Sequence, residues 1–159
     1  MEDKNEYVLI LGSKPEYKIP NLIFKHIYAA NGAVERVEKY KLSFPNFELI
    51  SVIGGREFEK NLEVKNRVLK STPDRMICRL GKVDIKKYSF PNHMKFKYFS
   101  NFQQLKIQSS FFKFGLMNII FLESFYEQKL IKKIYHLFRS VSKAAFVGTS
   151  TGFFAILCA

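Results

Sequence analysis

The chain has 159 residues, enough for one domain with a sizeable hydrophobic core. Its hydrophobic content of 47% is that of a globular protein and excludes a disordered chain. The formal net charge of +12, from 26 basic and 14 acidic residues, favours anionic partners: nucleotide phosphates, acidic sugars, acidic lipid head groups or nucleic acid.

Cysteine and histidine usage excludes several kinds of site. Cys78 and Cys158 lie far apart in apolar surroundings, which indicates reduced buried thiols in a cytosolic protein rather than a disulfide framework. The histidines have no metal-binding spacing, so we expect no metal site. The polar residues 1–6 do not form a signal peptide, and the apolar run 114–122 is too short to span a bilayer. A cytoplasmic location follows from these observations.

Strand and helix patterns alternate through the first half of the chain. An unbroken apolar run is typical of a buried parallel strand, and helical spacing of apolar residues separates such runs. The expected elements are strands at 7–11, 26–30, 47–53 and 75–80, with helices at 33–40 and 57–70. The alternation predicts an α/β fold, a Rossmann-like open, mostly parallel sheet flanked by helices, in a single domain over 1–159.

The second half of the chain is less regular. Aromatic and basic residues interleave over 86–99, which is compatible with a nucleic-acid surface. We favour an ordinary strand at 94–99 with lysines outward and aromatics inward. A short helix is expected at 101–111 and a long amphipathic one at 116–138. Basic residues late in the long helix suit its dipole, and core packing is favoured over binding to an anionic membrane.

The last stretch combines a small-residue turn with an apolar helix. Thr149, Ser150 and Thr151 can each act as an N-cap, and the run that follows Gly152 is apolar on every side. The pattern predicts a buried helix whose N-terminus is suited to an anion, because free N–H groups and the positive end of the dipole meet there. A capped core helix without a ligand is the alternative. Ala159 has no C-cap after it, so we expect the fold to be incomplete at the C-terminus.

Small or polar residues follow each of the first three strands. They are Gly12-Ser13, Asn31-Gly32 and Gly54-Gly55. Because the carboxyl ends of parallel strands lie at one edge of a sheet, a ligand crevice is expected there. No G-x-G-x-x-G fingerprint, G-x-S-x-G motif or acid/base pair is present, so the catalytic residues are unknown.

These three stretches resemble one family. Residues 8–15 resemble the opening strand and G-N-G-P turn of sialyltransferases that use CMP-activated sialic acid. Residues 28–31 look like the next strand, which ends in an Asn, and 150–157 resemble the small-residue S/T-S/T-G motif and its apolar helix. The bacterial lipooligosaccharide sialyltransferases have the same order of parts. The chain departs from the family at Ser13, where an Asn is usual, and at Lys14, where the second glycine is usual.

The resemblance implies a metal-independent, inverting glycosyltransferase with a Rossmann-like nucleotide-binding domain. Gly12, Ser13 and Asn31 would then line the CMP site. Ser150, Thr151 and Gly152 would hold the phosphate or carboxylate of the donor at the helix N-terminus. The family's general-base His lies beyond the matching region, so the chain is expected to be the N-terminal part of a longer glycosyltransferase and catalytically incomplete.

The sequence thus favours a sialyltransferase-type enzyme of bacterial surface polysaccharide or lipooligosaccharide synthesis. Its partners would be a CMP-activated sugar, used as a substrate without any further cofactor, and a glycan acceptor. Peripheral contact with the anionic inner membrane face is compatible with the basic charge. A truncated, inactive α/β remnant is the second hypothesis. A basic nucleic-acid-binding module ranks last, because the basic residues form no dense run, and we expect no nucleic-acid partner.

Overall fold

A computed structural model describes residues 7–12, 18–79, 81, 83–113, 131, 134 and 150–159. The chain divides into two compact units, residues 1–98 with 151–159 and residues 99–150. Each unit is described by itself. The expected single domain over 1–159 remains a prediction.

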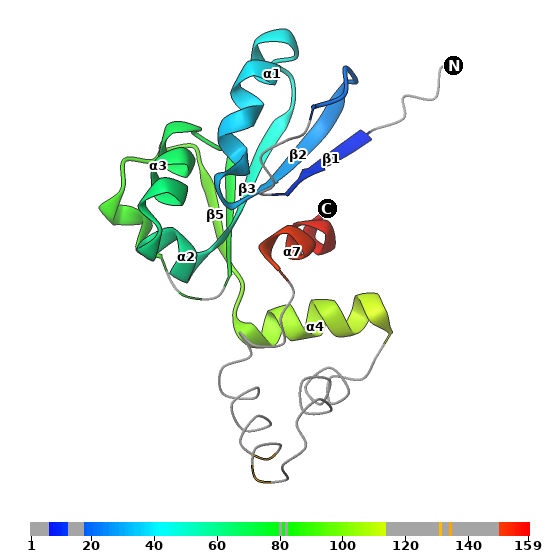
Figure 1. The fold of residues 1–159 in the computed structure, drawn as a ribbon, viewed down its shortest axis with the longest axis vertical. Coiled ribbons are helices and arrows are strands. Elements are labelled where there is room, and N and C mark those ends of the chain that lie inside the picture. Colours follow the sequence, from blue (N-terminus) through cyan, green and yellow to red (C-terminus); the bar gives the residue numbers. More distant parts are fainter. Residues whose placement is uncertain are drawn as a thin grey trace. The chain divides into compact units, whose positions relative to one another are not determined.

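The first unit is built on a five-stranded sheet in which every strand is parallel to its neighbours (Figure 1). The order is β1-β2-β3-β4-β5. The strands are β1 Tyr7–Leu11, β2 Phe24–Ala30, β3 Glu48–Gly54, β4 Arg75–Arg79 and β5 Lys95–Tyr98. The central strands are long apolar runs because helices cover both of their faces. The predicted α/β fold with an open parallel sheet is confirmed.

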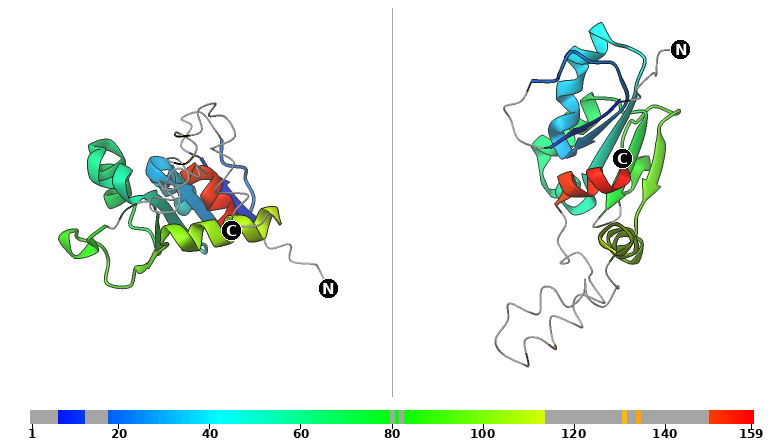
Figure 2. Two further views of the ribbon diagram at one scale, coloured as in Figure 1. Left: turned by 90° about the horizontal axis from the view of Figure 1, so that it is seen from below. Right: turned by 90° about the vertical axis from the view of Figure 1, so that its right-hand side faces the viewer.

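Helices occupy the two faces of this sheet unequally (Figures 1 and 2). One face is covered by α1 Val37–Ser43, α2 Gly55–Lys60 and α3 Leu62–Lys70, with the 3-10 turn η1 Asn31–Arg36 leading into α1. Sequential parallel strands joined by right-handed crossovers put their helices on the same face. The C-terminal helix α7, Thr151–Cys158, packs on the opposite face over β1, β2 and β3.

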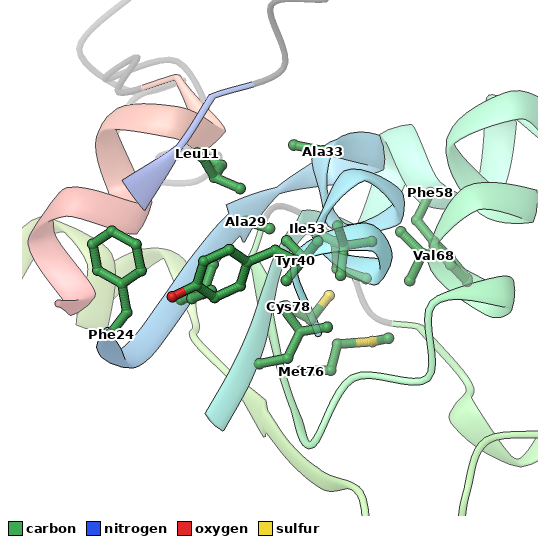
Figure 3. Packing of buried hydrophobic residues seen from close by; sticks show 14 of the residues in the cluster. Leu11, Phe24, Ala29, Ala33, Tyr40, Ile53, Phe58, Val68, Met76 and Cys78 are labelled. Carbon is green, nitrogen blue, oxygen red and sulfur yellow. The ribbon is translucent and has the colours of Figure 1, made fainter. Parts of the chain in front are cut away.

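The main core lies between the sheet and the first three helices (Figure 3). Alternate residues of β2 and β3, such as Ile27 and Leu49, point into it and meet Val34, Phe58 and Val68 from the helical layer. Tyr40 closes one end of this core by stacking on Phe44 and donating a hydrogen bond to the Leu22 carbonyl. The opposite face buries Phe154 and Ala155 of α7 instead.

One predicted helix is two helices in the structure. The helical pattern over 57–70 predicted a continuous element, but the backbone is extended at Asn61, with φ −98° and ψ 103°. The Asn61 side chain accepts hydrogen bonds from the backbone N–H groups of Glu63 and Val64, at 3.1 and 3.2 Å. This is an N-cap, which starts α3 afresh. The spacing of apolar residues does not reveal such a break, because the same helical spacing continues from α2 into α3 across the single residue Asn61.

The predicted strand at 94–99 and short helix at 101–111 are confirmed, but the last helix is not buried on every side as expected: in α7 only Phe154 and Ala155 are buried, and Ile156 is 45% exposed. In β5 the lysines are exposed and the aromatic residues half-buried, as expected of an alternating strand. Helix α4, Asn101–Phe112, lies in the second unit and starts with a capping box between Ser100 and Gln103. A short 3-10 turn, η2 Ile85–Lys87, was not predicted. The predicted helix at 116–138 falls outside the described residues except at 131 and 134, which are helical.

A buried hydroxyl interrupts the apolar core at the centre of β3. Ser51 is fully buried between Ala29 and Met76 on the neighbouring strands, and its Oγ has no hydrogen-bond partner among the residues that the structure describes. An unsatisfied buried hydroxyl is destabilising, so Ser51→Ala is expected to raise the free energy of unfolding by about 1 kcal/mol. Urea titration followed by circular dichroism measures this. A loss of stability in Ser51→Ala would mean that the hydroxyl is satisfied in solution.

Candidate functional site

The first three strands end side by side at one edge of the sheet, as the sequence predicted. β1 ends at Leu11, whose partner in β2 is Ala29, and Ala30 pairs with Val52 of β3. Gly12 follows β1 at this carboxyl edge. It is exposed, and a Cβ built on it would have no atom of the described part of the chain within 4 Å. The backbone at Gly12 is therefore open to the close approach of a ligand.

Asn31 joins the ends of β2 and β3. Its Oδ1 accepts a hydrogen bond from the backbone N–H of Gly54, at 3.2 Å. The residue has a positive φ of 50°, a conformation that asparagine tolerates better than most residues. Asn31 is half-buried, and its Nδ2 meets no hydrogen-bonding partner in the part of the chain that is described. One end of the amide thus holds the backbone while the other is available to a ligand.

The N-terminus of α7 reaches the same edge. Thr151 is the first residue of α7, and its Oγ1 would lie 3.6 Å from a Cβ built on Gly54. Asn31 and Thr151 therefore both approach Gly54, Asn31 at the backbone N–H and Thr151 at the position that a Cβ would occupy. Thr151 and Gly152 are half-buried, so the helix N-terminus is accessible to solvent. The free N–H groups of the first turn start at this point.

The remaining predicted site residues are placed less completely. Ser150 immediately precedes α7 and is exposed, and it is the last residue of the second unit. Ser13 lies outside the described residues, as does Thr149. The structure thus brings Gly12, Asn31, Thr151 and Gly152 to one edge of the sheet. Their roles in binding remain predictions.

The sequence analysis did not single out Arg79, which belongs to this edge. Arg79 ends β4, pairs with Gly54 of β3, and is only 1% exposed. Its guanidinium carbon lies 5.0 Å from the ring centroid of Phe154, in the first turn of α7. Burial lowers the pKa of Arg79 to about 10, so the side chain is charged at neutral pH. Its signal in the sequence was a charged residue at the end of an apolar strand.

The gathering of these residues at one edge does not arise from a reversal of strand order. Ligands of doubly wound sheets bind where the order reverses, but the order here is sequential from β1 to β5. The helices that lie near this edge instead cover different faces of the sheet. Helices α1 to α3 pack on one face and α7 on the other, and both η1 and α7 contact β2 and β3.

Titratable groups near this edge are engaged in structural contacts. The Glu57 Cβ would lie 3.6 Å from a Cβ on Gly54, but its carboxylate accepts a hydrogen bond from Asn61 Nδ2 at 2.9 Å. His26 pairs with Glu48 at the start of β3, away from the carboxyl edge, with Nδ1 3.0 Å from Oε2. Within the described residues, no three His, Cys, Asp or Glu side chains gather into a possible metal site.

A tight backbone contact supports the site from the β4 side. A Cβ on Gly55 would lie 2.2 Å from the Gly81 carbonyl oxygen, and the Cys78 thiol donates to the same oxygen at 3.2 Å. Gly81 itself has a φ of +119°, which favours glycine. Burial raises the pKa of the Cys78 thiol from 9.0 to about 12.

Because of this raised pKa, the free energy of unfolding should decrease as the pH becomes alkaline. Because the folded pKa lies above the unfolded one, the contribution of Cys78 is complete below pH 9 and is lost as the pH rises toward 12. The free energy of unfolding should fall by up to about 1.4 kcal/mol per pH unit above pH 9. Urea titrations from pH 8 to 10.5 measure the slope. Cys78→Ala should reduce the slope without abolishing it, because burial also raises the pKa of the Cys158 thiol to about 11. An unchanged slope in that variant would contradict the assignment.

The aromatic residues of the lysine-rich stretch are used in packing. Tyr88 packs edge-on against Phe58, with ring centroids 5.2 Å apart, and its hydroxyl donates to Glu59 at 2.7 Å. Phe90 packs on Tyr88, and Phe96 lies against the main core. These aromatic rings therefore pack against neighbouring side chains, as the sequence analysis favoured.

Comparisons with protein-family models, with curated proteins and with solved structures give no match to this chain. No helix among the described residues is both long and apolar enough to cross a membrane.

Proposed function

We propose that this chain binds a CMP-activated sugar at the carboxyl edge of β1, β2 and β3, as part of a sialyltransferase-type glycosyltransferase of bacterial surface polysaccharide synthesis. The observation that carries the proposal is the meeting of Asn31 and Thr151 on Gly54. These groups are far apart in the sequence, and both belong to the stretches that resemble the family. Because they converge on Gly54, one ligand could contact both groups.

Each group suits one part of such a donor. Asn31 Nδ2 is a hydrogen-bond donor, which suits the carbonyl of a cytosine ring. Gly12 leaves space for the nucleoside beside β1. The first N–H groups of α7 at Thr151 and Gly152 suit the phosphate or the sugar carboxylate. The charge of Arg79, buried under the same helical turn, favours an anion there over a neutral ligand.

The acceptor and its location are inferred from charge. A net charge of +12 attracts acidic glycans and the anionic inner leaflet of a bacterial membrane. We propose peripheral contact with that leaflet, where a lipid-linked glycan acceptor is presented. We identify no catalytic base among the described residues at this edge. We therefore propose that this chain binds the donor without completing transfer, which keeps an inactive α/β remnant as the second candidate.

Nucleotide binding is tested by thermal shift and isothermal titration with CMP, and with UMP and GMP as competitors. CMP at 100 times its dissociation constant should stabilise the fold by about 2.7 kcal/mol. Asn31→Asp should abolish the response to CMP because the carboxylate keeps the acceptor for Gly54 but has no donor for the base. The melting temperature of the free variant should stay close to that of the wild type.

Asn66→Asp is the matched control for this substitution. It makes the same change from amide to carboxylate at an exposed position on α3 that takes no part in the edge site. Asn66→Asp should therefore keep the full response to CMP. The proposal fails if no cytidine nucleotide stabilises the wild type, or if both Asp variants lose binding equally. Hydrolysis or transfer of the sugar by this chain alone would exclude the remnant.

A further inference from the structure

The two edges of the sheet differ in how they are protected. β5, at one end, carries Lys95 and Lys97 with exposed side chains, a common protection against pairing with another strand. β1, at the other end, is Tyr-Val-Leu-Ile-Leu and contains no charge, proline or glycine. Among the described strands β1 pairs with β2 alone, so its other side presents N–H and C=O groups to a further strand (Figure 1).

Exposed apolar side chains accompany this edge. Tyr7 and Val8 of β1 are 46% and 40% exposed, although both belong to the sheet. Leu22 and Ile23, which lead into β2 beside them, are 46% and 72% exposed. The Leu22 backbone is fixed, since its carbonyl accepts a hydrogen bond from the buried Tyr40. A cluster of this kind on an ordered edge marks an interaction surface.

The β1 backbone is regular enough to pair. The register passes from Tyr7–Phe24 to Val8–His26, so the extra residue of the irregularity is Lys25 in β2. A bulge in β2 leaves β1 extended over its whole length. A bulge in the edge strand itself would have twisted it away from a partner.

We propose that β1 pairs with β1 of a second copy of this chain, antiparallel and about a twofold axis, to form one continuous sheet across a dimer. Two copies that each carry +12 repel each other over most of their surfaces. An uncharged strand is a place where they can approach at little electrostatic cost. Antiparallel pairing about Leu9 matches Val8 with Ile10 of the second copy and Tyr7 with Leu11, so every cross-strand pair is apolar. The interface is isologous. The β1 edge of each copy is covered by the β1 edge of the other, so the assembly stops at two.

Sedimentation velocity from 5 to 200 µM, at about 150 mM salt, tests the oligomeric state. The wild type should pass from monomer to dimer with rising concentration. Val8→Lys should raise the dimer dissociation constant roughly tenfold or more, because each lysine would face the apolar Ile10 of the second copy and lie diagonal to the other lysine. Leu42→Lys is the matched control: Leu42 is apolar and 88% exposed, on α1 rather than the edge, and its variant should dimerise as the wild type does.

A second measurement needs no variant. Hydrogen exchange of the wild type should be slower in β1 at 200 µM than at 5 µM, while β5 exchanges at the same rate at both concentrations. The proposal is overturned by a monomer over the whole range, or by equal dissociation in Val8→Lys and Leu42→Lys. Growth beyond two copies, or protection of β5 in place of β1, would overturn it as well.

Discussion

Gly55→Ala is expected to lower the free energy of unfolding by about 3 kcal/mol, at the upper end of what overpacking usually costs. The added methyl would lie 2.2 Å from the Gly81 carbonyl oxygen and 2.8 Å from its carbon. These are backbone atoms, and Gly81 is held in a positive-φ conformation, so the loop cannot move aside by a side-chain rotation. Guanidinium unfolding followed by circular dichroism gives the difference.

The neighbouring glycine provides the control for this substitution. A Cβ on Gly54 would meet its nearest atoms at 3.6 Å, an ordinary contact, and the backbone there is extended, with φ −81° and ψ 115°. Gly54→Ala should therefore change the stability by less than about 1 kcal/mol. If Gly55→Ala were as mild as Gly54→Ala, the close approach of Gly55 to Gly81 would not exist in solution.

Phe154→Ala is expected to lower the free energy of unfolding by about 3–5 kcal/mol. Phe154 is fully buried between α7 and the sheet, and its ring lies against the guanidinium of Arg79. Truncation leaves a cavity and removes the ring from beside a buried charge. Because α7 holds Thr151 at the carboxyl edge, this variant should also lose the thermal response to CMP.

Two further substitutions grade this effect. Phe154→Leu keeps most of the apolar volume and should lose less than half of what the alanine variant loses, since shape changes without a large cavity cost about 1–2 kcal/mol. Ile156 lies on the same helix, and its side chain is 45% exposed. Ile156→Ala should therefore lower the free energy of unfolding by about 1 kcal/mol or less. Equal losses at positions 154 and 156 would mean that α7 is not packed on the sheet as described.

Local patterns sufficed for the strands of the sheet. β1 has the bounds that its apolar run predicted, and the other predicted strands differ by at most a few residues at their ends. The break at Asn61 and the 3-10 start of the helix after β2 were missed. Both depend on which backbone groups a side chain caps, and a spacing of apolar residues carries no information about that.

The candidate site was predictable in its residue types but not in its assembly. Asn31 was singled out because it follows an apolar strand, and Thr151 because it precedes an apolar helix that it can cap. Nothing local indicated that both approach Gly54. Arg79 was missed because an arginine at the end of a strand usually reaches solvent. It is buried here because α7, distant in the sequence, covers it.

The sequence by itself determined a parallel α/β sheet, because unbroken apolar runs that alternate with helical spacing have few other ways to bury their surface. It also determined which residues follow the strands. Only the tertiary structure decided that α7 covers the face opposite α1, α2 and α3, and that β1 is left as an uncharged edge. Both depend on contacts between segments far apart in the chain, whose energies no local pattern contains.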